Sequence, residues 1–533
     1  MKKLVTLLVV VLCLALSSPA MAAITPNGEL PIVDEPTTLK VWASAPATII
    51  DMETNGMTIW FEEQTGVHIE WIIVTDEADT KLNLSLASGD YPDMYFTSFS
   101  SPQVMLNANS GVFIPLNDLI ENHSTYYKQI LETDEILREN LTAPDGNIYT
   151  FYRTDAGVHM LSQNKMFVYQ PWLEQYTEAT GKGMPATTEE FEEMLIYFRD
   201  NDMNGNGDAT DEIPLSGSFS SWGGDPIAFL MNPFQLWHGD YLLGLDDTVS
   251  FIANTDQFRE GLRYINRLYE QGLIAEETYV QDTTQLKALV NQTDPSQVRV
   301  GVIPTAHVAQ YVDLSIMPTG LSDYVPIPPL EGPTGLRQAE TSGYNQITLY
   351  GAITSACEYP EVAMRWADYM LGGEGLETNY YGFEGEQFVW SDELSISGVT
   401  PSRTLTFTYG EPDNAWWGPY GIGPITDSTE LRYSETSVYG GYGWAHYTAH
   451  EAYEPYYVSV EFPIVPWVMD EDMATEISEL SILLGDYVKK SYTQFILGVV
   501  DIDDDTAWDA YKAELNNMGF ERYIELSQEV NFG

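Results

Sequence analysis

The sequence predicts an α/β protein in which strands and covering helices alternate along the chain. Apolar runs of strand length stand at 39–43, 67–74 and 93–97, and helical patterns fill the intervals at 56–64 and 76–88. The order strand, helix, strand, helix, strand indicates a parallel sheet with helices packed on its faces. A chain of 533 residues is too long for one ordinary core, so two or three domains are expected.

Later segments continue this alternation. One further helix is predicted from Phe258, Leu262, Ile265 and Leu268, which share one face before Gly272, and Pro360 begins another. The predicted helices span 256–271, 360–371, 473–497 and 505–518. Helical and extended segments therefore alternate to the end of the chain.

Residues 1–22 have the features of a signal peptide. Two lysines precede an apolar run at 4–16, and an A-x-A cleavage motif ends at Ala22. We therefore expect an exported protein, periplasmic or extracellular and associated with the cell surface. Lipid anchoring at Cys13 is the alternative, but the bulky Leu12 before it favours cleavage at Ala22.

The charge of the chain excludes some partners. It carries 79 acidic and 23 basic residues, for a formal net charge of −56. Such a surface repels nucleic acid and anionic lipid, so no nucleic-acid partner is expected. Cys357 is the only cysteine left after cleavage, which rules out an intramolecular disulfide and a cysteine-based metal site.

One acidic loop has the spacing of a calcium site. Residues 200–214 read D-N-D-M-N-G-N-G-D-A-T-D-E-I-P. Oxygen donors stand on alternate residues at Asp202, Asn204 and Asn206, and Gly207 follows, as in the first half of an EF-hand loop. An acidic turn stabilised by its own side chains is the alternative explanation. We predict a bound calcium ion with a structural role.

The residues alone leave the register of this loop open. Counting from Asp202 places Asn204 third, whereas counting from Asp200 places Asp211 twelfth. Asp202 and Asn204 are ligands in both registers. Because Pro214 prevents an immediate second helix, the loop is half an EF-hand and would not open and close as a calcium sensor does.

Six segments, in their order along the chain, resemble the extracellular solute-binding proteins of bacterial ABC importers, and within them the lipoprotein-like and alginate-oligosaccharide-binding members. The segments are L-K-V-W at 39–42, W-F-E-E-Q-T-G-V-H-I-E-W at 60–71, K-L-N-L-S-L-A-S-G-D-Y-P-D at 81–93, I-P-L-N-D-L-I at 114–120, C-E-Y-P-E-V-A-M-R-W-A-D-Y-M-L at 357–371 and Y-G-F-E-G-E at 381–386. The resemblance spans nearly the whole chain after the signal peptide.

This resemblance implies a two-lobed periplasmic-binding-protein fold of type II. Two α/β lobes are joined by crossing strands, the ligand lies in the cleft between them, and the lobes close about a hinge. On this basis the N-terminal lobe comprises 23–157 and 330–384. The C-terminal lobe comprises 158–329 and 385–533 and contains the calcium loop.

The resemblance also implies a set of calcium ligands. The loop of these relatives is similar to D-P-N-G-N-G-x-x-D-E-I-P, which favours the register that begins at Asp202. Asp208 matches the residue that offers its backbone carbonyl, and this chain has one additional residue before Asp211. The matching side-chain ligands are Asp202, Asn204, Asn206, Asp211 and Glu212.

Aromatic residues in Gly-rich or polar segments are the candidates for ligand contact. Aromatic residues form 13% of the chain. Their faces pack on the apolar faces of sugar rings, while nearby polar groups bind hydroxyls, so an oligosaccharide is the predicted ligand. A neutral glycan is favoured over a uronate because basic residues are few. The candidate ligand-binding residues are Trp222, Trp237, Trp416, Trp417, Tyr420, Trp444 and Asp90.

These observations predict a monomeric binding protein that passes an oligosaccharide to an ABC import permease. A secreted, calcium-stabilised glycoside hydrolase is the main alternative, since it needs only two carboxylates across a cleft. No H-E-x-x-H, G-x-S-x-G or Walker motif is present, and no catalytic residue is predicted. An adhesion protein stiffened by calcium is disfavoured by the α/β alternation.

Overall fold

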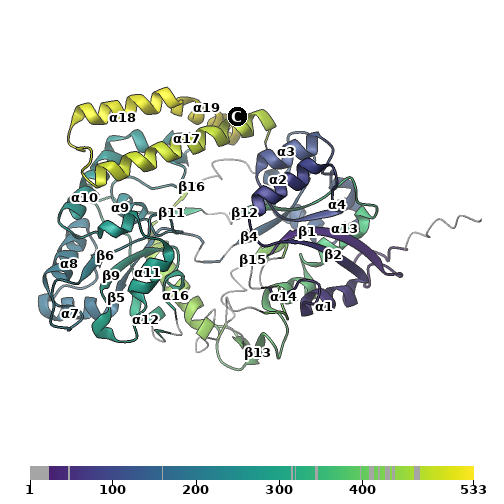
Figure 1. Ribbon diagram of the computed structural model, residues 1–533, viewed down its shortest axis with the longest axis horizontal. Helices are drawn as coiled ribbons and strands as arrows, with labels where there is room; N and C mark the ends of the chain where they lie inside the picture. The colour runs from purple at the N-terminus through teal and green to yellow at the C-terminus, as the bar shows by residue number, and fades with distance from the viewer. Residues whose placement is uncertain are drawn as a thin grey trace, which may run out of the picture.

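The computed structural model describes residues 23–45, 49–155, 157–158, 160–313, 316–317, 320–342, 346–396, 398–406, 413–417, 421–425, 433–434, 438–460 and 469–532. Two α/β lobes lie side by side, each with its own sheet and its own hydrophobic core (Figure 1). The two-lobed α/β architecture predicted from the sequence is confirmed.

The N-terminal lobe is built on a six-stranded sheet. Strands β1, β2 and β3 are parallel, whereas β12 is antiparallel to both β3 and β4 and β15 is parallel to β4. In sheet order the strands are β15 (Gly423–Ile425), β4 (Phe151–Asp155), β12 (Gln346–Ile353), β3 (Met94–Phe99), β1 (Thr37–Ser44) and β2 (Val67–Val74). The three strands predicted at the start of the chain are β1, β2 and β3.

Helices of this lobe begin and end where the sequence provides caps. Asn55 accepts a hydrogen bond from the backbone N–H of Met57 at the start of α1, and Gly66 ends that helix with a φ of 72°. The helices are α1 (Gly56–Thr65), α2 (Ala78–Ser88), α3 (Ser101–Asn109), α4 (Asn117–His123), α5 (Tyr126–Thr133), α6 (Glu135–Leu141), α13 (Pro360–Tyr369) and α14 (Gly373–Tyr381).

The C-terminal lobe has a smaller, mixed sheet of four strands. Its strands in order are β10 (Tyr324–Ile327), β5 (Lys165–Tyr169), β9 (Val300–Thr305) and β6 (Ile213–Leu215). Its helices include α7 (Gln170–Thr180), α8 (Thr188–Asp200), α9 (Ile227–Met231), α10 (Asp256–Glu270), α11 (Thr283–Val290) and α12 (Gly320–Asp323), and β7 (Leu242–Leu245) pairs with β8 (Thr248–Phe251). On α10 the four residues predicted to share one face are buried: Phe258, Leu262, Ile265 and Leu268.

The last part of the chain covers one side of the molecule. Helices α17 (Glu471–Ile496), α18 (Asp505–Met518) and α19 (Phe520–Phe532) lie over the C-terminal lobe, and α17 extends toward α3 of the other lobe (Figure 1). Just before α17, the backbone N–H of Met469 donates to Ser101 Oγ on α3. No helix in the described ranges is both long and apolar enough to cross a membrane.

The chain crosses between the lobes at places that differ in part from those predicted. It first leaves the N-terminal lobe between β4 and β5, an interval that includes residue 158. It returns after β11 (Ala339–Ser342), which pairs in parallel with β16 (Tyr457–Val460). The predicted return near 330 is too early, because Leu330 and Ala339 belong to the C-terminal core.

The predicted third crossing near 385 is wrong. Strand β15 pairs with β4 in the N-terminal sheet, and Ile422 beside it lies in the N-terminal core. Helix α16 (Val438–Tyr453) is then the next described element of the C-terminal lobe, with Ala445 and Ala449 in that core. The N-terminal lobe therefore extends to residue 425 at least.

Candidate functional site

The carboxyl ends of the parallel strands mark the side of the N-terminal lobe that faces its neighbour. Strand β4 runs in the same direction as β1 and β3, and the chain continues from its carboxyl end into the other lobe. Ligands of open α/β sheets bind beyond this edge. Asp90 precedes β3 and therefore lies at the opposite edge of the sheet, so its predicted place in the cleft is wrong.

Trp222 is an exposed ring next to the first crossing. Its side chain is 40% exposed, and its Nε1 donates to Oε1 of Gln163 at 2.5 Å. Gln163 lies between β4 and β5, on the segment that joins the lobes. The ring of His307 meets the Trp222 ring edge-on, with 5.5 Å between centroids. These contacts orient a large aromatic face at the junction of the lobes, where a ligand held between them could reach it.

Helix α16 brings a second predicted tryptophan to the same region. Trp444 is 45% exposed and its ring lies 6.2 Å from that of Tyr447. His446, two residues further along α16, contacts the ring of His307 at 5.2 Å. Trp222, His307 and α16 are thus linked through ring contacts. The predicted Tyr420 lies outside the described residues.

The structure places three other predicted contact residues in the cores. Trp416 and Trp417 are 6% and 2% exposed in the N-terminal core, and their indole N–H groups donate to Asn379 O and Thr58 Oγ1. Trp237 is 7% exposed in the C-terminal core and stacks on Phe258, with 6.3 Å between centroids. Rings buried in a core offer no face to a sugar. The prediction that these three tryptophans contact the ligand in the cleft is therefore wrong.

Among the described tryptophans, one further ring is as exposed as Trp222 and Trp444. Trp390 is 39% exposed and lies on β13 (Phe388–Ser391). Trp390 is not among the predicted contact residues, because those predictions rest on Gly-rich or polar flanking segments and Trp390 has none of the glycines that mark the others. Phe388, Val389 and Trp390 are all apolar, so no alternation of polar and apolar residues in this strand marks Trp390 as exposed.

A charged cluster that the sequence did not reveal joins the C-terminal lobe to the crossing strand β11. His238 pairs through Nδ1 with Asp240 and through Nε2 with Glu340 at 3.4 Å, and Glu340 lies on β11. Asn164, on the first crossing, reaches Glu340 at 3.4 Å. About 100 residues separate His238 from Glu340, so no local pattern could predict the pair.

The charges of this cluster favour a protonated imidazole. Burial by itself lowers the pKa of His238, but the negative charges of Asp240 and Glu340 outweigh burial and raise this pKa to about 9. Burial raises the pKa of Glu340, while the nearby His238 lowers it. Near neutral pH the cluster is therefore an imidazolium between two acidic groups.

In the predicted calcium loop, Asp202 is the centre of the hydrogen bonding. Its Oδ1 accepts from the backbone N–H of Gly205 at 2.8 Å and of Asn206 at 3.1 Å, and its Oδ2 accepts from Gly207 at 2.8 Å. The carboxylate of Asp200 is instead bound by its neighbour Arg199, at 2.7 and 3.1 Å. The local structure therefore favours the register that begins at Asp202.

The acidic residues at the end of the loop accept hydrogen bonds from groups in its first half. Asp211 accepts from Asn204 Nδ2 at 3.4 Å and from Asn206 Nδ2 at 3.1 Å. Oε1 of Glu212 accepts from the backbone N–H of Met203 at 2.9 Å. Asp208 is exposed and its side chain bonds Thr210, which leaves its backbone carbonyl for the predicted role.

The surroundings of Glu212 indicate whether a cation would fit this loop. Glu212 is only 9% exposed, its Oε2 has no hydrogen-bond partner in the described part of the chain, and burial raises its pKa. A buried acceptor left without a partner is unfavourable, and a bound cation would satisfy it. Within the described ranges no three His, Cys, Asp or Glu side chains could hold a metal by themselves. The amide and carbonyl oxygens of the loop are therefore needed to complete a site.

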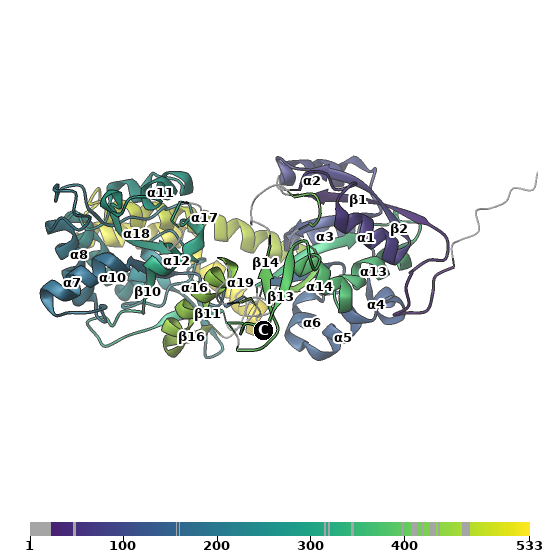
Figure 2. The same ribbon diagram turned by 90° about the horizontal axis from the view of Figure 1, so that it is seen from below.

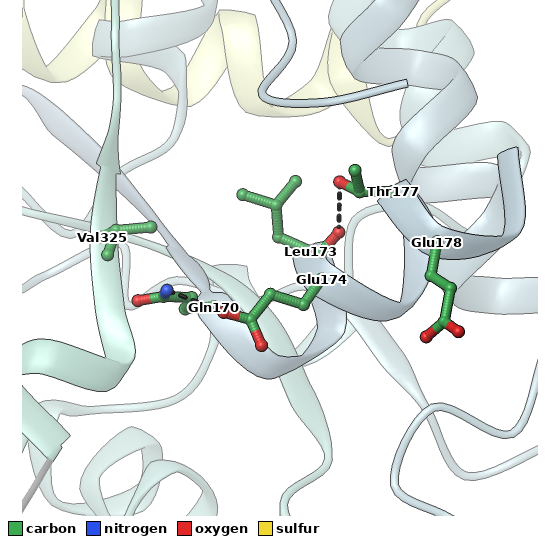
Figure 3. A pocket seen from close by; sticks show the side chains of 6 residues that line it. All are labelled: Gln170, Leu173, Glu174, Thr177, Glu178 and Val325. Atoms are coloured by element: carbon green, nitrogen blue, oxygen red, sulfur yellow. Dashed lines mark hydrogen bonds between the residues drawn. The ribbon is translucent and has the colours of Figure 1, made fainter. Parts of the chain in front are cut away.

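A hollow of about 390 Å³ lies elsewhere, against α7 and β10 of the C-terminal lobe (Figure 3). It is open, and its lining includes the carboxylates of Glu174 and Glu178 and the side chain of Val325. It has no aromatic lining residue and does not adjoin the crossing segments, so it is not the candidate ligand site.

Comparison with known proteins agrees with this architecture. Residues 39–376 match the family model described as bacterial extracellular solute-binding protein. The fructooligosaccharide ABC transporter substrate-binding protein FusA of Streptococcus pneumoniae serotype 4 is 28% identical over 520 residues, which cover 94% of this chain and 90% of FusA. Lipoprotein LipO of Bacillus subtilis is 26% identical over 359 residues, which cover 65% of this chain and 67% of LipO.

Solved structures resemble the whole molecule. The S. pneumoniae FusA EF-hand mutant in complex with fructo-nystose is 26% identical, with a TM-score of 0.75 over 92% of this chain and 98% of that one. FusA in complex with kestose is 27% identical, with the same TM-score and coverage. A solute-binding protein from Bifidobacterium longum infantis, described as HMO binding, has a TM-score of 0.76 over 93% of this chain and 98% of that one. At 17% identity it shows the fold alone.

Proposed function

Because the chain belongs to the family of bacterial extracellular solute-binding proteins, we propose that it captures an oligosaccharide between its lobes and passes it to the permease of an ABC importer. FusA, a substrate-binding protein of this kind, matches over nearly the whole chain and supports the proposal. Membership of this family makes the chain an exported binding protein and not an enzyme, so the glycoside hydrolase alternative is abandoned.

The exposed ring of Trp222 at the lobe junction is the observation that carries the sugar-binding proposal. An aromatic face fixed by a side-chain hydrogen bond is suited to pack on a sugar ring at small entropic cost. The net charge of −56 favours a neutral glycan over an acidic one. The binding of kestose and fructo-nystose by FusA makes neutral fructooligosaccharides the first ligands to test.

We further propose a structural calcium ion in the loop at 200–214, with the protein acting as a monomer in the periplasm or at the cell surface. The unpartnered Glu212 Oε2 and the hydrogen bonds around Asp202 support the site. The presence of an EF-hand in FusA supports it as well. The ion would supply positive charge that neutralises Asp202, Asp211 and Glu212 and holds their loop closed. It has no part in ligand chemistry.

Titration of the purified protein with a glycan panel tests the binding function. The panel contains kestose, fructo-nystose, neutral milk oligosaccharides and an oligouronate of similar length. We expect isothermal titration calorimetry to detect binding of at least one neutral oligosaccharide, with no new reducing ends after prolonged incubation. Cleavage of a panel member, or binding of the oligouronate alone, would contradict the proposal.

Replacing Trp222 by alanine is expected to weaken oligosaccharide binding about 10-fold. Loss of one aromatic stacking contact removes roughly 1.4 kcal/mol, which is a factor of ten in Kd. Val280→Ala is the matched control, because Val280 is 82% exposed in the same lobe and takes no part in the ring contacts. Calorimetric Kd values for the two variants check the prediction, and equal Kd values would remove Trp222 from the site.

A further inference from the structure

A short hairpin of the N-terminal lobe presents the exposed Trp390 on a rigid base. Strands β13 and β14 (Ser402–Leu405) are antiparallel, and Trp390 stands directly opposite Arg403. Arg403 is 4% exposed, and its guanidinium lies 4.5 Å from the centroid of the Trp390 ring. The same guanidinium lies 3.5 Å from the ring of Tyr381 and 2.5 Å from Glu377, both on α14. The arginine therefore ties the hairpin to α14.

These contacts fix one face of Trp390 and leave the ring 39% exposed. The ring of Phe388 meets it edge-on at 5.5 Å. A cation stacked on an aromatic ring contributes about 1 kcal/mol and restricts the ring to one orientation. An exposed tryptophan with few remaining rotamers loses little entropy when a second partner packs on it. A role in stabilising the hairpin alone would not require so much of the ring to stay exposed.

The hairpin is located where the two lobes meet. It belongs to the N-terminal lobe through its contacts with α14, yet β14 also contacts α16, whose buried residues Ala445 and Ala449 belong to the C-terminal core. Figure 2 shows β13 and β14 between the lobes, beside α16. Helix α16 is the element that carries Trp444 and reaches Trp222 through the two histidine rings. Helix α16 thus connects the hairpin that carries Trp390, on the N-terminal lobe, with the ring contacts of Trp222 on the C-terminal lobe.

We propose that Trp390, held by Arg403, is a second stacking platform that contacts a sugar unit of the bound oligosaccharide from the N-terminal lobe. This inference rests on the proposed function and extends it to the recognition of ligand length. A ligand that reaches both platforms joins the two lobes through its own rings. The binding of short and long oligosaccharides therefore depends on Trp390 to different degrees.

Three variants test this role. Trp390→Ala removes the platform, Trp390→Phe keeps an aromatic ring over Arg403, and Val389→Ala is the matched control. Val389 is 40% exposed on the same strand and points to its other face. For the tightest-binding neutral oligosaccharide of the panel, we expect Trp390→Ala to raise Kd roughly 5-fold, within the range of one stacking contact. Trp390→Phe keeps most of the affinity, Val389→Ala keeps all of it, and the loss is smaller for a shorter oligosaccharide of the same series.

A spectroscopic readout separates contact with the ligand from indirect effects. In protein labelled with 5-fluorotryptophan, the fluorine resonance absent from Trp390→Phe belongs to Trp390. We expect it to shift when the oligosaccharide is added. If the unsubstituted protein binds no sugar, the proposed function itself fails. If that protein binds sugar, while Trp390→Ala binds equally well and the resonance does not move, the second platform is overturned and the proposed function stands.

Discussion

Removal of calcium is expected to lower the free energy of unfolding by about 3 to 4 kcal/mol when the free ion had been present at 100 to 1,000 times its Kd. The ion binds the folded loop and not the unfolded chain, so its removal withdraws stability by mass action. Without it, Asp202, Asp211 and Glu212 repel one another, and Glu212 Oε2 stays buried without a partner. Thermal unfolding with and without a chelator, after metal analysis, measures the effect.

Two isosteric variants locate the ion within the loop. Glu212→Gln removes one negative charge from a buried ligand position and is expected to abolish most of the calcium-dependent rise in Tm. Asp200→Asn is the matched control, because the Asp200 carboxylate is bound to Arg199 and lies outside the favoured register. If the calcium-dependent rise in Tm persisted in Glu212→Gln but disappeared in Asp200→Asn, the register that begins at Asp200 would be the correct one. An unchanged Tm after verified metal removal would reject the site altogether.

The fold could be predicted from the sequence because its elements carry strong local signals. Periodic apolar residues and Pro360 as a first helical residue predict helices that the structure reproduces within a few residues. The third crossing could not be placed in this way. Strand β15 has only three residues, and its pairing with β4 is a contact between distant parts of the chain.

The tryptophans show where sequence reasoning about the site fails. Flanking glycines made Trp222 a candidate for ligand contact, and its ring is exposed in the structure. The same argument fails for Trp416 and Trp417, because an irregular segment can pass over a sheet and insert its side chains into the core. Each of their indole N–H groups has a partner on a helix far away in sequence, Asn379 on α14 and Thr58 on α1. Such partners are visible only in the folded chain.

The cluster around His238 gives the second large prediction. Between pH 6.5 and 9 the unfolded protein, whose histidine has an ordinary pKa, loses the proton that the folded protein retains. Native protein binds more protons than unfolded protein over this interval, so stability falls as pH rises. The contribution of His238 to the free energy of unfolding is at its maximum below pH 6.5 and is lost as the pH rises past 9. A shift of this size corresponds to about 3 kcal/mol.

The variant His238→Gln isolates this contribution from other titrating groups. Its amide can still donate to Glu340 but carries no proton that titrates. In urea unfolding we expect the variant to have a lower free energy of unfolding than the unsubstituted protein at pH 6. We expect this gap in unfolding free energy to be much smaller at pH 9.5. Burial raises the pKa of Glu340, and loss of the His238 charge in the variant removes an interaction that lowers it. Because Glu340 lies on β11, the strand from which the chain returns to the N-terminal lobe, the imidazolium holds one end of a crossing segment. If the difference in unfolding free energy between the two proteins stayed constant with pH, His238 would act through packing and not through its charge.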